Sequence, residues 1–111
     1  MGAIDTMLKS EYTHMYRLVS RLREECLQRP KGSIVVKTRG NSRYIYLVLR
    51  REGRVVTEYV GKEGTWKAKG IEAKIVERRR YETELREAET QMGRLRKMMK
   101  ASGVFFVEPM R

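Results

Sequence analysis

The spacing of apolar residues changes twice along the 111-residue chain, and this change restricts the fold more than any other feature of the sequence. In the first quarter, apolar residues recur in steps of three and four, as in a heptad seam along one side of a helix. From Ser33 the spacing falls to two, which is typical of strands, and it later returns to three and four. We therefore predict an α+β fold in which a long helix, a small sheet and a second long helix follow one another.

The two predicted helices cover residues 5–28 and 71–101, with Asp5 as a plausible N-cap and Pro30 beyond the end of the first. Isolated helices are marginal in water, so each apolar seam needs a partner. We expect the seams to pack together as an antiparallel helical hairpin, or coiled coil, with the sheet at its closed end. The same seams could instead pair between chains and form a homodimer. The seams comprise Ile4, Leu8, Tyr12, Met15, Val19, Leu22 and Cys26 in the first helix, and Tyr81, Leu85, Ala88, Met92, Leu95 and Met99 in the second.

Three runs rich in β-branched and aromatic residues predict strands at Ser33–Thr38, Arg43–Arg50 and Val55–Val60. The segments between them, Gly40-Asn41-Ser42 and Glu52-Gly53, carry residues that tolerate positive φ, as hairpin turns require. The simplest assembly is a three-stranded antiparallel meander over residues 33–60. A connector with glycines and lysines follows at 61–70, and an apolar tail at 102–111 could add a strand or dock onto the helices. At this length we expect a single domain, 1–111.

The net charge of +11 is concentrated in the middle of the chain. Residues 1–28 carry no net charge, residues 29–70 carry +8 and residues 71–111 carry +3. Mixed-sign charge is typical of a solvated helix face, whereas a cluster of one sign indicates a polyanionic partner. The meander and its connectors are therefore the basic part of the protein.

The alternation of residues along the strands predicts two different sheet faces. If Glu52-Gly53 is a two-residue loop, Tyr46 lies opposite Tyr59 and Arg50 lies opposite Val55. A slip of one residue would exchange the faces. The apolar face, expected against the helices, contains Ile34, Val36, Ile45, Leu47, Leu49, Val56 and Val60, with Glu58 as the one discordant member. The other face contains Lys37, Arg39, Tyr44, Tyr46, Arg50, Thr57 and Tyr59, interleaved with Val35, Val48 and Val55.

The second face has the composition of a nucleic-acid-binding surface. Arg and Lys neutralise phosphates and release counterions, while Tyr rings stack on exposed bases or pack on sugars. A small sheet can also lie in a major groove. We therefore expect DNA or RNA as the partner, although the same face could be an ordinary basic surface or bind a protein. Candidate binding residues are Lys37, Arg39, Arg43, Tyr44, Tyr46, Arg50, Arg54, Tyr59, Lys67, Lys69, Arg78 and Arg79, the last two within the Arg78-Arg79-Arg80 run of the second helix.

Residues for catalysis are scarce in this sequence. It holds one Cys, Cys26, and one His, His14, which excludes a disulfide framework and a thiolate metal cluster within the chain. Cys26 falls on the apolar seam and is expected to be a small buried hydrophobe. Asp5 is the only Asp, and the sequence shows no cluster of Asp and Glu near the basic segment such as a metal-dependent nuclease would need. We expect a non-catalytic protein with no metal and no cofactor.

The sequence also predicts where the protein works. It has no apolar stretch near 18 residues, which argues against a membrane span or a membrane partner. Its first residues lack the basic start and apolar core of a signal peptide. We therefore expect a cytoplasmic protein.

Four short motifs of the meander resemble a group of small uncharacterised proteins of prokaryotes and mobile elements. The motifs are Lys31-Gly32-Ser33, Tyr44-Ile45-Tyr46-Leu47, Arg51-Glu52-Gly53 and Tyr59-Val60-Gly61-Lys62. The resemblance implies a meander flanked by helices, and the group has no known function to transfer. The meander is more loosely similar to the three-stranded DNA-binding arm of phage-type integrases, which implies contact between the sheet and the major groove.

The link to mobile elements suggests a second hypothesis. The protein would be an interaction module, such as a phage-encoded inhibitor of a nucleic-acid-guided defence nuclease, similar to anti-CRISPR proteins. Its partner would then be a protein or a nucleoprotein complex. The binding surface would be the helical hairpin or the tail around Phe105-Phe106.

Overall fold

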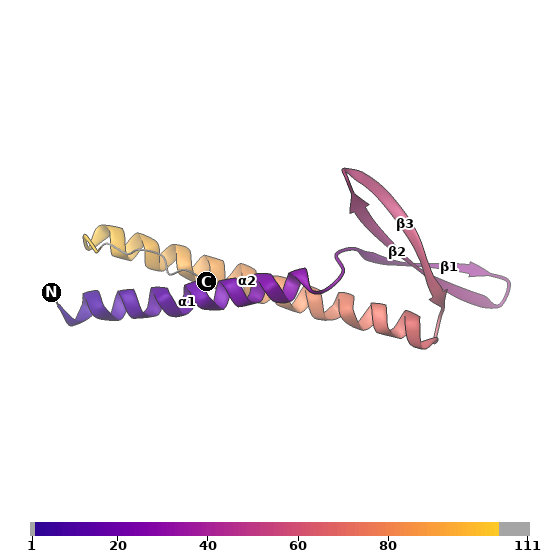
Figure 1. The fold of residues 1–111 in the computed structure, drawn as a ribbon, viewed down its shortest axis with the longest axis horizontal. Coiled ribbons are helices and arrows are strands. Elements are labelled where there is room, and N and C mark those ends of the chain that lie inside the picture. The colour runs from indigo at the N-terminus through magenta and orange to yellow at the C-terminus, as the bar shows by residue number, and fades with distance from the viewer. Residues whose placement is uncertain (1, 105–111) are drawn as a thin grey trace. The chain divides into compact units, whose positions relative to one another are not determined.

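The structure, a computed structural model, describes residues 2–104. Its elements follow the predicted order and confirm the α+β class (Figure 1). Within the described residues the chain divides into two compact units, one formed by residues 2–25 and 81–104 and the other by residues 26–80. The elements are α1 (Ala3–Leu27), β1 (Ser33–Arg39), β2 (Ser42–Arg51), β3 (Arg54–Lys62) and α2 (Trp66–Ala101).

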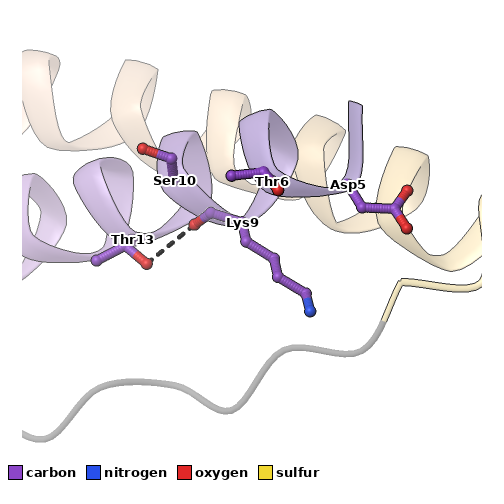
Figure 2. Close-up of a pocket in the computed structure, with 5 residues that line it drawn as sticks. All are labelled: Asp5, Thr6, Lys9, Ser10 and Thr13. Carbon is purple, nitrogen blue, oxygen red and sulfur yellow. Dashed lines mark hydrogen bonds between the residues drawn. The ribbon is translucent and has the colours of Figure 1, made fainter. Parts of the chain in front are cut away.

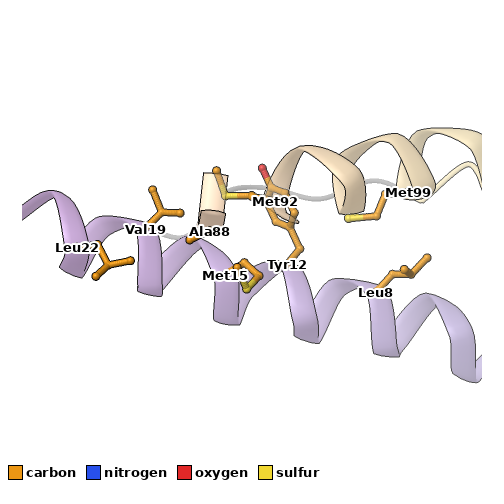
Figure 3. Close-up of a cluster of buried hydrophobic side chains, with 8 residues drawn as sticks. All are labelled: Leu8, Tyr12, Met15, Val19, Leu22, Ala88, Met92 and Met99. Atoms are coloured by element: carbon orange, nitrogen blue, oxygen red, sulfur yellow. The ribbon is translucent and has the colours of Figure 1, made fainter. Parts of the chain in front are cut away.

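The first unit is an antiparallel helical hairpin made of α1 and the second half of α2. Its direction is shown by two polar contacts: Arg96 donates to the Tyr12 hydroxyl at 3.0 Å, and Arg23 pairs with Glu89 at 3.6 Å. Residues early in α1 therefore meet residues late in α2, and the seams pack within one chain as predicted. Figure 3 shows the buried side chains that both helices direct into the space between them. They are Leu8, Tyr12, Met15, Val19, Leu22, Ala88, Met92 and Met99.

Burial of side chains along this seam stabilises the hairpin. Val19 and Leu22 are only 1% and 2% exposed, and full burial of such a side chain contributes roughly 1.5–3 kcal/mol. Tyr81, Leu85 and Leu95 are partly buried and pack against the same cluster. Of the predicted seam, Ile4 alone is largely exposed, because it lies in the first turn of α1. This pattern follows the heptad spacing of the sequence.

Helix α2 ends in a Schellman motif, as the glycine after it predicts. Gly103 adopts a left-handed φ of 69°, and its backbone N–H donates to the carbonyl of Lys100 at 3.2 Å. The N–H of Val104 donates to the carbonyl of Met99 at 2.8 Å. Val104 then packs against the hairpin core. The rest of the predicted apolar tail, from residue 105 onward, lies outside the described residues.

The second unit contains a three-stranded antiparallel sheet in the order β1-β2-β3. The loop between β2 and β3 is the predicted two-residue turn, in which Glu52 and Gly53 have φ values of 50° and 77°. Positive φ at both central residues defines a type I′ turn, whose twist matches that of the flanking strands. Tyr46 lies opposite Tyr59, so the predicted register is confirmed.

Helix α2 begins at Trp66, five residues before its predicted start. Thr65 explains the difference, because its side-chain oxygen accepts a hydrogen bond from the N–H of Ala68 at 3.4 Å, the geometry of an N-cap. Gly70 lies inside the helix and not in a loop, at a cost of about 1 kcal/mol relative to Ala. The predicted connector at 61–70 was therefore wrong: its first residues belong to β3 and its last to α2.

Buried apolar side chains of the second unit come from the sheet, from the end of α1 and from the first half of α2. They are Cys26, Ile45, Leu47, Ala68 and Ile75. Both buried sheet residues belong to the face predicted to be apolar, and Cys26 is buried as expected. Across residues 2–104, neither helix contains a segment long and apolar enough to span a membrane.

Two adjacent methionines near the end of α2 test the assignment of the hairpin seam. Met99 is 4% exposed and Met98 is 54% exposed. We expect Met99→Ala to lower the free energy of unfolding by about 2–4 kcal/mol, because it leaves a cavity in the seam. Met98→Ala should change it by less than about 0.5 kcal/mol. Chemical denaturation followed by circular dichroism measures both, and an equal or larger effect at Met98 would show that the seam is misassigned.

Candidate functional site

One face of the sheet gathers tyrosines and cations from all three strands. Tyr44 and Tyr46 lie on the central strand, with Lys37 of β1 opposite Tyr44 and Tyr59 of β3 opposite Tyr46. Cross-strand partners point to the same side of a sheet, so these side chains share one face, which we call the tyrosine face. By register the tyrosine face contains Ser33, Val35, Lys37, Arg39, Ser42, Tyr44, Tyr46, Val48, Arg50, Val55, Thr57, Tyr59 and Lys62.

The three tyrosine rings form one cluster at the surface. The centroids of Tyr46 and Tyr59 are 5.4 Å apart in an edge-to-face arrangement, and those of Tyr44 and Tyr59 are 6.3 Å apart. The Lys37 ammonium lies 4.5 Å from the centroid of the Tyr46 ring, within the range of a cation–π contact. Tyr59 remains 59% exposed. With Arg39, the rings line an open depression of about 380 Å³.

A β-bulge brings Lys62 onto the tyrosine face. Tyr46 pairs with Tyr59, but the next residue of β2, Ile45, pairs with Gly61, so Val60 is an extra residue in β3. The bulge resets the alternation of side chains and places Lys62 opposite Tyr44. Lys62 is absent from the predicted site because the predicted strand ends at Val60. Gly61 at the end of an apolar run was the available signal, since glycine in a strand often marks a bulge.

Two acidic residues of the sheet region, Glu58 and Glu63, pair with arginines away from the tyrosine face. Glu58 is opposite Leu47 on the other face, where it pairs with Arg51 at 2.6 Å. Glu63, just after β3, pairs with Arg43 at 3.2 Å. The Arg51 partner accounts for Glu58, the one discordant member of the predicted apolar face.

The charged residues of the tyrosine face are all cations. No Asp or Glu belongs to it by register, and no acidic side chain of residues 2–104 forms an ion pair with its cations. Those cations are Lys37, Arg39, Arg50 and Lys62, all of them exposed. Acidic groups therefore pair with Arg43 and Arg51 on the opposite face, whereas the four cations of the tyrosine face have no acidic ion-pair partner within residues 2–104.

Some predicted binding residues are not part of the tyrosine face. The register places Arg43, opposite Thr38, and Arg54, opposite Arg51, on the other side of the sheet. Lys67 and Lys69 are exposed in the first turns of α2, and Arg79 is exposed further along that helix. Of the twelve predicted residues, six share the tyrosine face: Lys37, Arg39, Tyr44, Tyr46, Arg50 and Tyr59.

 Lys62, which the prediction did not include, is the seventh cation or tyrosine of this face.

Arg78 has a structural role that its place in a run of three arginines does not reveal. One terminal nitrogen of its guanidinium donates to the carbonyls of Cys26 and Arg29, at 2.6 and 2.7 Å. These carbonyls lie at the end of α1 and just beyond it, where backbone acceptors lack partners within the helix. Arg29 in turn pairs with Glu77 at 2.8 Å. Arg78 therefore fastens the end of α1 to α2, and the hydrogen bonds that its guanidinium makes there give it a structural role beside its predicted one in binding.

A second depression lies on α1 and has a different character (Figure 2). One carboxylate, Asp5, and one ammonium, Lys9, balance its charge. Thr13 donates its hydroxyl to the carbonyl of Lys9 at 2.9 Å, a contact within the helix itself. The remaining lining residues are Thr6 and Ser10. This site concentrates neither charge nor aromatic surface, unlike the tyrosine face.

The described residues offer no metal site. No group of three or more His, Cys, Asp or Glu side chains in residues 2–104 could hold a metal ion. His14 is exposed on α1, whereas Cys26 is buried. The tyrosine face is therefore the strongest candidate for function within the described chain.

The structure gives a physical reason for the motifs that carry the family resemblance. A Cβ on Gly32 would lie 2.5 Å from the Val48 carbonyl oxygen, so only glycine fits there without a shift of the backbone. In Tyr-x-Tyr-Leu the two tyrosines point to the tyrosine face, while Leu47 is buried on the other. In Tyr-x-Gly-Lys the bulge places Tyr59 and Lys62 on the same face.

Comparison of the chain with protein-family models, curated proteins and solved structures found no match. The resemblance seen in the motifs therefore stays a prediction. Conclusions about function rest on the geometry and charge of the tyrosine face.

The role of Arg78 can be separated from that of an ordinary surface arginine. We expect Arg78→Ala to lower the free energy of unfolding by about 2 kcal/mol, because the carbonyls at the end of α1 lose a charged donor. Arg86→Ala, at an exposed position of the same helix, is the matched control and should change it by less than about 0.5 kcal/mol. Thermal and urea denaturation measure both variants. Equal effects would contradict the structural role of Arg78.

Proposed function

We propose that the protein binds nucleic acid, without catalysis, through the tyrosine face. The observation that carries this proposal is the separation of charge between the two faces of the sheet. Glu58 and Glu63 pair with arginines away from the tyrosine face, while four cations and three tyrosine rings share the tyrosine face with no acid. An ordinary solvated surface mixes both signs of charge.

The expected energetics follow from the charge of the ligand. Each phosphate neutralised by Lys or Arg releases condensed counterions, which favours binding most at low salt. The logarithm of the binding constant should fall with the logarithm of salt concentration, with a slope of about −0.7 per contact for single strands and −0.9 for duplex DNA. Lys37, Arg39, Arg50 and Lys62 could supply up to four such contacts.

The ring cluster adds a second kind of contact. Tyr rings pack on sugars or stack on exposed bases, and both contacts are apolar and depend little on salt. Tyr59 is available for this because most of its surface is exposed beside the depression. Cations around a cluster of rings therefore match a polymer in which phosphates alternate with sugars and bases.

A charge-matched pair of variants tests the proposal. The first variant, Lys37→Ala/Arg39→Ala/Arg50→Ala, removes three cations from the tyrosine face. The second, Arg17→Ala/Arg21→Ala/Arg86→Ala, removes three exposed cations from the helices and leaves the sheet unchanged. Fluorescence anisotropy with labelled single-stranded and duplex DNA and RNA, at two salt concentrations, measures binding by each.

We expect the first variant to lose at least about tenfold in affinity at low salt and to reduce the magnitude of the salt slope by about two. The second variant should stay within about threefold of the unmodified protein, since its cations lie outside the face. Equal losses in both variants would mean that the total charge, and not the tyrosine face, attracts the ligand. Absence of binding to all four ligands would contradict the proposed function itself.

A further inference from the structure

We propose that the tyrosine face binds a single strand and that Tyr59 is its principal base-stacking residue. This inference rests on the proposed function and makes it more specific. It follows from the positions of the rings and cations, because an exposed ring can stack on an unpaired base but not on the bases of a duplex. Tyr44, Tyr46 and Tyr59 line the depression, whereas the Lys37 ammonium is positioned over the Tyr46 ring.

Of the three tyrosine rings, that of Tyr59 is the most accessible to a ligand. Tyr46 is covered in part by the Lys37 ammonium at 4.5 Å, and both Tyr44 and Tyr46 are half-buried on the central strand. Tyr59 packs against both of them and is still 59% exposed. Two neighbouring rings hold it in position, which lowers the loss of side-chain entropy when a ligand stacks on it.

Only an unpaired base can use such a ring. In a duplex the faces of each base are already stacked on the neighbouring base pairs, and the grooves present only base edges and the sugar–phosphate backbone. In a single strand the bases can turn outward and stack on aromatic side chains. The exposed ring would add little to duplex binding but would favour a single strand by about fivefold to a hundredfold for each stacked base.

The cations sit where the phosphates of such a strand would pass. Arg39 lines the depression together with the rings, and Lys62 lies opposite Tyr44 at the end of β3. The bases could then contact the ring cluster while the phosphates contact the cations around it. The chemistry is shared by single-stranded DNA and RNA, so both polymers are included in the test.

The experiment compares single-stranded and duplex oligonucleotides with the same number of phosphates at one salt concentration, using the full chain. We expect single-stranded DNA or RNA to bind at least about tenfold more tightly than the duplex. Tyr59→Ala should remove about tenfold of the single-strand affinity and leave duplex affinity unchanged. Tyr59→Phe keeps the ring and should bind as the unmodified protein does. Tyr59→Leu keeps apolar bulk without a ring and should behave as Tyr59→Ala does.

Each outcome decides one of the two proposals. Duplex binding as tight as single-strand binding, or an equal loss of both in Tyr59→Ala, would overturn the inference while the proposed function stands. A loss in Tyr59→Ala that Tyr59→Leu restores would show that apolar packing, and not base stacking, is responsible, and would also overturn it. Failure of the unmodified protein to bind any oligonucleotide would refute the proposed function instead.

Discussion

The pairing of β2 with β3 is the constraint on which the candidate site depends. A type I′ turn at Glu52-Gly53 sets this pairing and brings Tyr46 opposite Tyr59. A slip of one residue would move every side chain of the strand to the other face. The tyrosines would then replace the buried Ile45 and Leu47, and the sheet would lose its apolar face. Folding and the proposed function therefore require the same register.

This register determines on which face of the sheet the ion pairs lie. Surface ion pairs contribute little to stability, typically below about 1 kcal/mol, so Arg51–Glu58 and Arg43–Glu63 explain little of the fold. Their position matters more than their strength. Because both carboxylates are engaged away from the tyrosine face, the positive potential of that face is not cancelled by neighbouring acids. Four cations without an acidic residue among them by register thus share one face of the sheet.

The sequence predicted the features that depend on periodicity and missed those that depend on particular hydrogen bonds. The heptad seam placed Leu22 and Met99 in the hairpin core, and the two-residue turn placed Tyr46 opposite Tyr59. The bulge that moves Lys62 depends on backbone pairing that alternation alone cannot show. The role of Arg78 depends on contacts with residues about fifty positions earlier in the chain. A run of three arginines gives no sign of which one points inward.

Lysine acetylation followed by mass spectrometry tests the central claim most directly, that ligand covers the tyrosine face. Lys37 and Lys62 lie on this face, whereas Lys97 is exposed on the hairpin. At a saturating concentration of single-stranded oligonucleotide, we predict that the acetylation rates of Lys37 and Lys62 fall at least about fivefold and that the rate of Lys97 does not change. Protection of Lys97 with no protection of Lys37 and Lys62 would contradict the account.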